Sequence, residues 1–234
     1  MNLAERDTEL RELMDDPNCD LAQLRATLRR FGIVNRLVAG WGAVYRQTLR
    51  PTLAQLGRPA RILDLGCGGG DLIASLSHLA QRDGFAVDWL GIDPEPTAIA
   101  VAQAREKLHG VHYRLAESSQ LLAEGESFDV VISNHVLHHL DSRALSIFAA
   151  HSLALSSGIV LHSDIERGRL AYALYNIGIT PLAPGTFLRT DGLRSIRRSY
   201  RADELASALG QPWRVHRPGR FRLLASAAGS AVRG

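Results

Sequence analysis

The sequence is almost free of lysine. Lys107 is the only lysine, so nearly all of the basic charge comes from arginine. The formal net charge is a modest +3, and no lysine-rich or aromatic-interleaved basic stripe runs along the chain. Because nucleic-acid binding relies on such positively charged surfaces, we expect no nucleic acid as a partner.

Cysteines and long apolar runs are also scarce. Cys19 and Cys67 are the only cysteines; they are too few for a disulfide framework, and their spacing does not indicate a metal site. No stretch reaches the roughly 18 apolar residues of a membrane helix. The N-terminus is charged rather than signal-like. We therefore expect a cytoplasmic protein with no membrane span and no metal.

Residues 61–71 are the most informative segment. An apolar run breaks into four glycines and is followed by a helical pattern, the geometry that lets a backbone approach a ligand closely. The spacing is not the Gly-x-Gly-x-x-Gly that seats a pyrophosphate. An acidic residue on the strand also repels phosphate and tolerates a cation. The segment therefore favours a nucleoside with an ammonium and a sulfonium, with an ordinary glycine turn as the alternative. Its binding candidates are Asp64, Gly66, Cys67, Gly68 and Gly70.

This segment resembles the first motif of the class I S-adenosylmethionine-dependent methyltransferases. An apolar strand over 87–93 follows it and ends in Asp93. In doubly wound sheets a carboxylate at this strand tip accepts hydrogen bonds from ribose hydroxyls. We assign that role to Asp93, with Pro94 beside it. The alternative is that Asp93 caps the helix expected over 95–108.

The resemblance continues through two later motifs. Within residues 111–119 the family places an acidic residue beside the adenine, which implies this role for Glu117 and a backbone contact for Ser118. A solvated loop glutamate is the alternative. Residues 127–140 match the fourth motif, and the family places its reactive centre at this strand tip.

The resemblance over 60–162 implies an α/β fold with a Rossmann-like, doubly wound, seven-stranded sheet, mostly parallel with an antiparallel last strand. Helical spacing predicts a helical N-terminal leader or lid over 1–57, in which Pro51 is a break. We expect the leader to cover the carboxyl ends of the strands, with packing on the outer face as the alternative. The resemblance implies that residues 58–234 form the S-adenosylmethionine-binding domain, and we expect a cap insertion at about 166–200.

Histidines are the candidate bases, because their ordinary pKa lies near neutrality. His135 follows Asn134 at the fourth strand tip, and the resemblance places both beside the cofactor. His162 ends the fifth strand and is expected to face the same pocket. His139 belongs to a His-His pair that we interpret as structural first and as a catalytic candidate second.

The family resemblance implies methyl transfer from S-adenosyl-L-methionine, with S-adenosyl-L-homocysteine as product. Residues 161–172, 188–192 and 195–198 look like bacterial methyltransferases of polyketide or quinone-type pathways. We therefore expect a small-molecule acceptor with a phenolic, quinol or polyketide-type oxygen, and a monomer or homodimer. The alternatives are a macromolecule (RNA or protein) methyltransferase and a non-catalytic cofactor-binding module.

Overall fold

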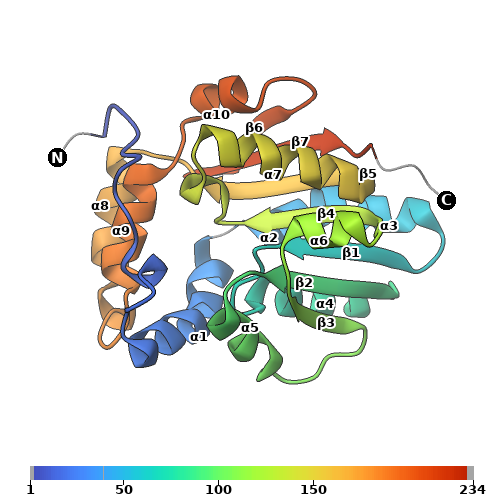
Figure 1. Cartoon of the computed structure of the whole chain (residues 1–234), viewed down its shortest axis with the longest axis horizontal. Helices are drawn as coiled ribbons and strands as arrows, with labels where there is room; N and C mark the ends of the chain where they lie inside the picture. The colour runs from blue at the N-terminus through green and yellow to red at the C-terminus, as the bar shows by residue number, and fades with distance from the viewer. Residues whose placement is uncertain (1–2, 39, 231–234) are drawn as a thin grey trace.

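The computed structural model describes residues 3–38 and 40–230, which form one seven-stranded sheet with helices on both faces (Figure 1). The sheet order is β3-β2-β1-β4-β5-β7-β6. The strands are β1 (Ala60–Leu65), β2 (Val87–Asp93), β3 (Val111–Leu115), β4 (Phe128–Asn134), β5 (Ser156–Ile165), β6 (Arg214–Gly219) and β7 (Arg222–Ala228). Strands β1 to β5 pair in parallel, and β7 is antiparallel to both β5 and β6. The predicted fold class is confirmed.

Two apolar clusters, one on each face, hold the sheet between layers of helices. One face is covered by α2 (Trp41–Val44), α3 (Arg50–Leu56), α4 (Asp71–Arg82) and α5 (Pro96–Gln103). The other is covered by α6 (Ser118–Ala123), α7 (Ser142–Leu155) and α10 (Ala202–Leu209). Every residue of β4 except the last is buried, as expected for a central parallel strand covered on both faces. The tips of the strands are thereby fixed in place.

The helix expected over 95–108 is shorter than predicted, since α5 ends at Gln103. Arg105 turns back instead, and its Nε donates a hydrogen bond to the carbonyl of Gly69 in the glycine loop. The segment after α5 therefore braces the loop rather than extending the helix.

The leader is also less helical than predicted. Residues 3–20 contain only one 3-10 turn, Leu13–Asp15, and helix α1 (Leu21–Val38) begins after Asp20. The carboxylate of Asp20 accepts the N–H groups of Ala22 and Gln23, as an N-cap does. Residues 1–2 and 39 of the predicted leader lie outside the described residues.

Pro51 does not break the leader, contrary to expectation. It lies in the first turn of α3, and the backbone stays helical across it, because a π-helical turn, Tyr45–Leu49, joins α2 directly to α3. Within the described residues no helix is both long and apolar enough to cross a membrane.

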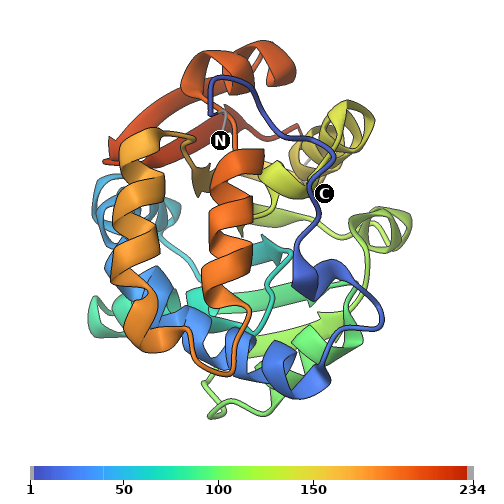
Figure 2. The same ribbon diagram turned by 90° about the vertical axis from the view of Figure 1, so that its left-hand side faces the viewer.

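The interruption predicted at 166–200 is a helical cap. Helices α8 (Arg169–Gly178) and α9 (Leu188–Arg198) stand side by side beyond the carboxyl ends of the parallel strands, joined through the 3-10 turn Thr180–Leu182 (Figure 2). Residues 3–16, which we call the N-terminal strap, run along α9, while α1 passes below both cap helices. The strap, α1 and the cap thus enclose one end of the sheet.

Candidate active site

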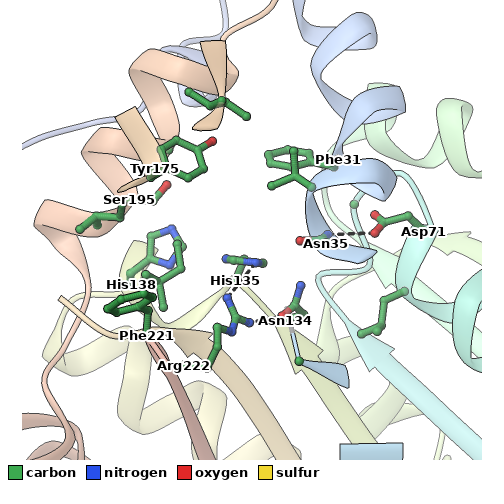
Figure 3. A pocket seen from close by; sticks show the side chains of 18 of the residues that line it. Phe31, Asn35, Asp71, Asn134, His135, His138, Tyr175, Ser195, Phe221 and Arg222 are labelled. Carbon is green, nitrogen blue, oxygen red and sulfur yellow. Dashed lines mark hydrogen bonds between the residues drawn. The ribbon is translucent and has the colours of Figure 1, made fainter. Parts of the chain in front are cut away.

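A cavity of about 690 Å³ lies between the carboxyl ends of β1 and β4, helix α1 and the cap (Figure 3). Its wall joins segments that are far apart in sequence. The strap, α1, the glycine loop, the tip of β4, both cap helices and the start of β7 all contribute. Several residues of the leader, from Glu12 to Asn35, line this cavity, and its role as a lid stays a prediction.

The glycine loop forms the floor of one half of the cavity. Gly66, Gly68 and Gly70 all have positive φ, at 73°, 53° and 74°. A Cβ at Gly68 would point into open space, whereas one at Gly70 would meet the hydroxyl of Tyr113 at 2.5 Å. The alternation of glycine thus serves two purposes, which are an open surface at Gly68 and close packing at Gly70.

We expect Gly70→Ala to destabilise the protein by roughly 2–4 kcal/mol, because both the left-handed backbone and the Tyr113 ring oppose a Cβ. Gly125→Ala is the matched control, since Gly125 has φ 73° with nothing near its missing Cβ. That control is expected to cost about 1–2 kcal/mol. Urea unfolding of both variants measures the difference, and equal losses would show that the Tyr113 contact is unimportant.

Asp64 is a buried carboxylate without a partner. It is 1% exposed and lines the cavity, and neither carboxylate oxygen has a hydrogen bond among the described residues. Burial, reinforced by Asp71 and Asp93, raises the pKa of Asp64 well above its ordinary value. Buried polar groups are nearly always paired, so this carboxylate indicates a missing cationic ligand.

Helix α1 contributes Asn35, which pairs with a second carboxylate on this side of the cavity. The amide of Asn35 donates to the carboxylate of Asp71 at 2.8 Å, while its own Oδ1 is buried without a partner. Burial raises the pKa of Asp71 despite this hydrogen bond.

The residues predicted to hold the ribose and adenine lie outside the cavity wall as the structure defines it. Asp93 accepts hydrogen bonds from the N–H groups of Gly68 and Glu95, each at 2.9 Å, and so braces the loop. Pro94 follows it. Glu117 is exposed and forms a capping box with Gln120, and the Ser118 hydroxyl meets His151. Their contacts with a cofactor stay predictions.

The tip of β4 carries the polar groups at the centre of the other half of the cavity. The Asn134 amide oxygen accepts from Trp41 at 3.0 Å and from Arg222 at 2.7 Å. His135 has φ 62°, rare for a non-glycine residue and typical of strained functional sites. The Arg222 guanidinium donates to Nε2 of His135 at 3.1 Å (Figure 3). Burial and Arg222 together hold the pKa of His135 well below its ordinary value, so this ring is neutral.

His138 is clamped between two carboxylates. Its Nδ1 lies 2.7 Å from Asp164, and its Nε2 lies 3.2 Å from Glu12 of the strap. Burial alone would lower the pKa of His138, but the two carboxylates outweigh it and raise that pKa to about 9. His138 is therefore a structural imidazolium at neutral pH, and it ties the strap to the tip of β5.

The other two histidines differ in access to the cavity. His139 lines the cavity, with its side chain 29% exposed, and meets Asp15 of the strap at 3.3 Å. His162 does not line it. Alternate residues of a strand face opposite sides, so His162 points away, between Phe148 and Trp213. Its Nδ1 bonds to Ser133, and burial lowers its pKa to about 3. The expectation that His162 faces the pocket is wrong.

Arginines hold the strap by its backbone carbonyls. Arg198 reaches Leu10 at 2.7 Å, and Arg194 reaches Arg11 at 2.7 Å. Arg167 bonds to the carbonyls of Leu3 and Ala4. In return, Asp191 of α9 accepts the N–H groups at 13 and 14. These bonds place the Glu12 side chain in the site.

Two groups of side chains have atoms close enough to share a metal ion, among the described residues. They are Glu12 with His138 and His139, and His135 with His138 and Asp164. Both nitrogens of His138 already contact carboxylates. The expectation of a metal-free protein stays a prediction.

Sequence reasoning missed two charged groups at the centre of the site, Glu12 and Arg222. Glu12 lies in a charged segment that resembles any solvated one. Arg222 had a usable signal, since it is an arginine at the start of the apolar run Leu223–Ala225.

Comparison with known proteins now identifies the chain. Residues 62–158, which include the glycine loop and the β4 tip, match the family model described as a methyltransferase domain. A ubiquinone biosynthesis O-methyltransferase of Azorhizobium caulinodans is 32% identical over 70% of this chain and 61% of its own length. The chain belongs to the class I S-adenosylmethionine-dependent methyltransferases.

Other methyltransferases support the same family and fold. A ubiquinone biosynthesis O-methyltransferase of Caulobacter sp. is 32% identical over 68% of this chain and 61% of its own length. Human N-acetylserotonin methyltransferase, solved with S-adenosylmethionine, superposes with a TM-score of 0.57 at 14% identity, covering 88% of this chain and 55% of that one. The chain thus spans about three fifths or less of the length of the curated relatives that it matches.

Proposed function

We propose that this methyltransferase binds S-adenosyl-L-methionine and transfers its methyl group to an oxygen of a small phenolic, quinol or polyketide-type molecule, releasing S-adenosyl-L-homocysteine. The observation that carries the proposal is the unpaired Asp64 carboxylate beside an open Gly68. Together they offer a cationic ligand a counter-ion and a surface free of side chains.

The residues present fit this cofactor. Asp64 would hold the ammonium of its methionine part, and the loop from Gly66 to Gly70, with Cys67, would lie against the sugar. Asp93 keeps the ribose role, with Pro94 beside it. Glu117 and the N–H of Ser118 keep the adenine role, because a free N–H is available at the start of α6.

The chemistry needs positioning more than activation. When bound, the cofactor supplies a methyl group already activated by its sulfonium. This chain's residues must hold the acceptor oxygen in line, a contribution of roughly 7–11 kcal/mol when the geometry is favourable. Asn134 and His135 lie where the cofactor half meets the cap half of the cavity. His139 is the histidine candidate with an exposed ring.

A small acceptor is favoured over a macromolecule by the enclosure of the site. The strap, α1 and the cap surround the cavity, and much of the wall formed by α1 and the cap is apolar, including Phe31, Leu174 and Ile179. The relatives named as O-methyltransferases of ubiquinone biosynthesis support an oxygen acceptor and a quinol or phenol. We also propose that residues 1–57 act as a lid.

Calorimetry with S-adenosylhomocysteine, followed by transfer of labelled methyl into phenols, quinols, RNA and protein, tests the proposal. We expect binding and labelling of small phenols or quinols only. Labelled RNA or protein would favour the macromolecule alternative. Binding without labelling of any acceptor would favour the non-catalytic module, and absence of binding would refute the assignment.

A further inference from the structure

Arg222 is a buried cation whose hydrogen bonds go to neutral groups. It is 3% exposed and lines the cavity. Its guanidinium donates to His135, to the Asn134 amide oxygen and to the Ser163 hydroxyl, all of them uncharged. Among the described residues it forms no ion pair with a carboxylate, and its Nε is buried without a partner. Buried cations normally have an anionic partner, so one is missing here.

The neighbouring carboxylates do not supply that partner. Asp164 on β5 is the anion that acts on Arg222 through space, but its oxygens accept from the ring and N–H of His138 and from the N–H at 165. Glu12 is directed at His138 and Ser195. Both carboxylates are thus engaged by other donors.

The charges around Arg222 leave the guanidinium without a carboxylate in direct contact. Arg222 and His138 carry positive charge, and Asp164 and Glu12 carry negative charge, so this cluster is neutral as it stands. Because Asp164 and Glu12 bond to His138 instead, an acceptor oxyanion would be the direct partner of Arg222.

We propose that Arg222 binds an oxyanion of the acceptor, so that the substrate is an acidic phenol or enol that reacts in its ionised form. This inference rests on the proposed function of the cavity. The guanidinium fork is suited to this task, because it offers several parallel N–H donors to an oxyanion. Arg222 is then the acceptor-binding residue that selects acidic hydroxyls over neutral alcohols.

The proposed step balances without a histidine base. The acceptor hydroxyl loses its proton to bulk water before reaction. An electron pair of the oxyanion forms the new bond to the methyl carbon, while the carbon–sulfur bond breaks and its pair stays on sulfur. Because Nε2 of His135 accepts a hydrogen bond from Arg222, its ring proton is on Nδ1, and Nε2 is occupied. His135 then orients the guanidinium rather than removing the proton.

The test uses 4-nitrocatechol, whose absorption reports ionisation, and 3,4-dihydroxybenzoate, which adds a ring carboxylate. Both are titrated into the full chain with and without S-adenosylhomocysteine. We expect bound 4-nitrocatechol to ionise at a pH lower by about one unit or more, a tenfold preference for the anion. Arg222→Gln is expected to abolish the shift, and Arg214→Gln, an exposed arginine on β6, to retain it.

The two probes separate the sources of the negative charge. A shift for 4-nitrocatechol that depends on Arg222 identifies the reacting hydroxyl as the bound oxyanion. Arg222-dependent binding of 3,4-dihydroxybenzoate alone, with no shift for 4-nitrocatechol, identifies a ring carboxylate as the bound anion and overturns the proposal that the reacting hydroxyl is ionised. No shift and no Arg222-dependent binding of either probe overturns the proposal.

Folding and cofactor binding are followed separately. If Arg222→Gln does not fold, Arg222→Lys keeps the charge without the fork and is expected to retain a reduced shift. A wild-type titration without any shift overturns the proposal whatever the variants do. Failure of S-adenosylhomocysteine to bind refutes the proposed function instead, and the probe titration of the unliganded chain still reports on Arg222.

Discussion

Replacing Asp64 with asparagine is expected to stabilise the unliganded protein and, at the same time, to weaken its affinity for S-adenosylhomocysteine by roughly 100-fold. The two effects have one cause. The carboxylate is buried without a partner, so its charge costs free energy until a cation arrives. Asparagine removes the charge and therefore both the cost and the attraction.

The stability gained by Asp64→Asn should change with pH in a direction that can be checked. Burial raises the pKa of Asp64, so the unfolded chain ionises first and the folded protein loses stability as the pH rises above about 4. The advantage of Asp64→Asn should then be on the order of 1 kcal/mol or more at pH 7 and should vanish in acid. Urea unfolding at several pH values and calorimetry measure the two effects.

Asp88→Asn is the matched control for this experiment, because Asp88 is an exposed carboxylate on β2 paired only at the surface. It should change neither quantity appreciably. If Asp64→Asn kept its affinity within about threefold, the carboxylate would not be the counter-ion of the cofactor.

The second large effect is expected for His138→Leu, which should cost roughly 3–5 kcal/mol of stability at pH 7. The substitution leaves Glu12 and Asp164 facing each other, buried, without the cation between them. Their mutual repulsion falls when they take up protons. The loss should therefore shrink as the pH is lowered toward 4.

The wild-type protein should show the complementary profile. The pKa of His138 is raised to about 9 in the folded state, so its contribution is complete below about 6.5 and disappears as the pH rises through 9. The pKa values of Glu12 and Asp164 are lowered, because His138 and its neighbours outweigh the effect of burial, so their contribution is lost in acid. Maximal stability is expected between these limits.

Urea unfolding of the wild type, His138→Leu and the exposed control His109→Leu at pH 4.5, 6.5 and 9.5 provides the measurement. The control should stay within about 0.5 kcal/mol of the wild type. A loss below about 1 kcal/mol for His138→Leu at pH 6.5 would mean that His138 is not held as a cation between two charged carboxylates.

The parts of the site that are contiguous in sequence were predictable. Strand, glycine loop and helix follow one another within residues 60–82, so the positions of Asp64 and Gly68 follow from local rules. The strand order then follows from the motif order, because parallel strands with helical crossovers allow few arrangements.

The parts assembled from distant segments were not predictable. Glu12 reaches His138 across 126 positions of sequence, and Arg222 reaches His135 across 87. The error at His162 has a different cause. One residue of register decides which face of β5 a side chain occupies, and an apolar run buried on both faces carries no alternation to show it.

Residues 8–11 of the strap are held through main-chain carbonyls, and this has a consequence for how their sequence can vary. A guanidinium can donate a hydrogen bond to a backbone carbonyl whichever amino acid carries that carbonyl. A randomised library of residues 8–11 should therefore yield many folded clones, whereas Arg198, which bonds to the Leu10 carbonyl and is itself buried, should accept few replacements. Arg6 is left unchanged in this library, because its own side chain bonds to Tyr200 and to the carbonyls of His138 and Leu140. The strap residues that offer only their carbonyls are thus expected to tolerate mutation, and the arginine that binds those carbonyls is not.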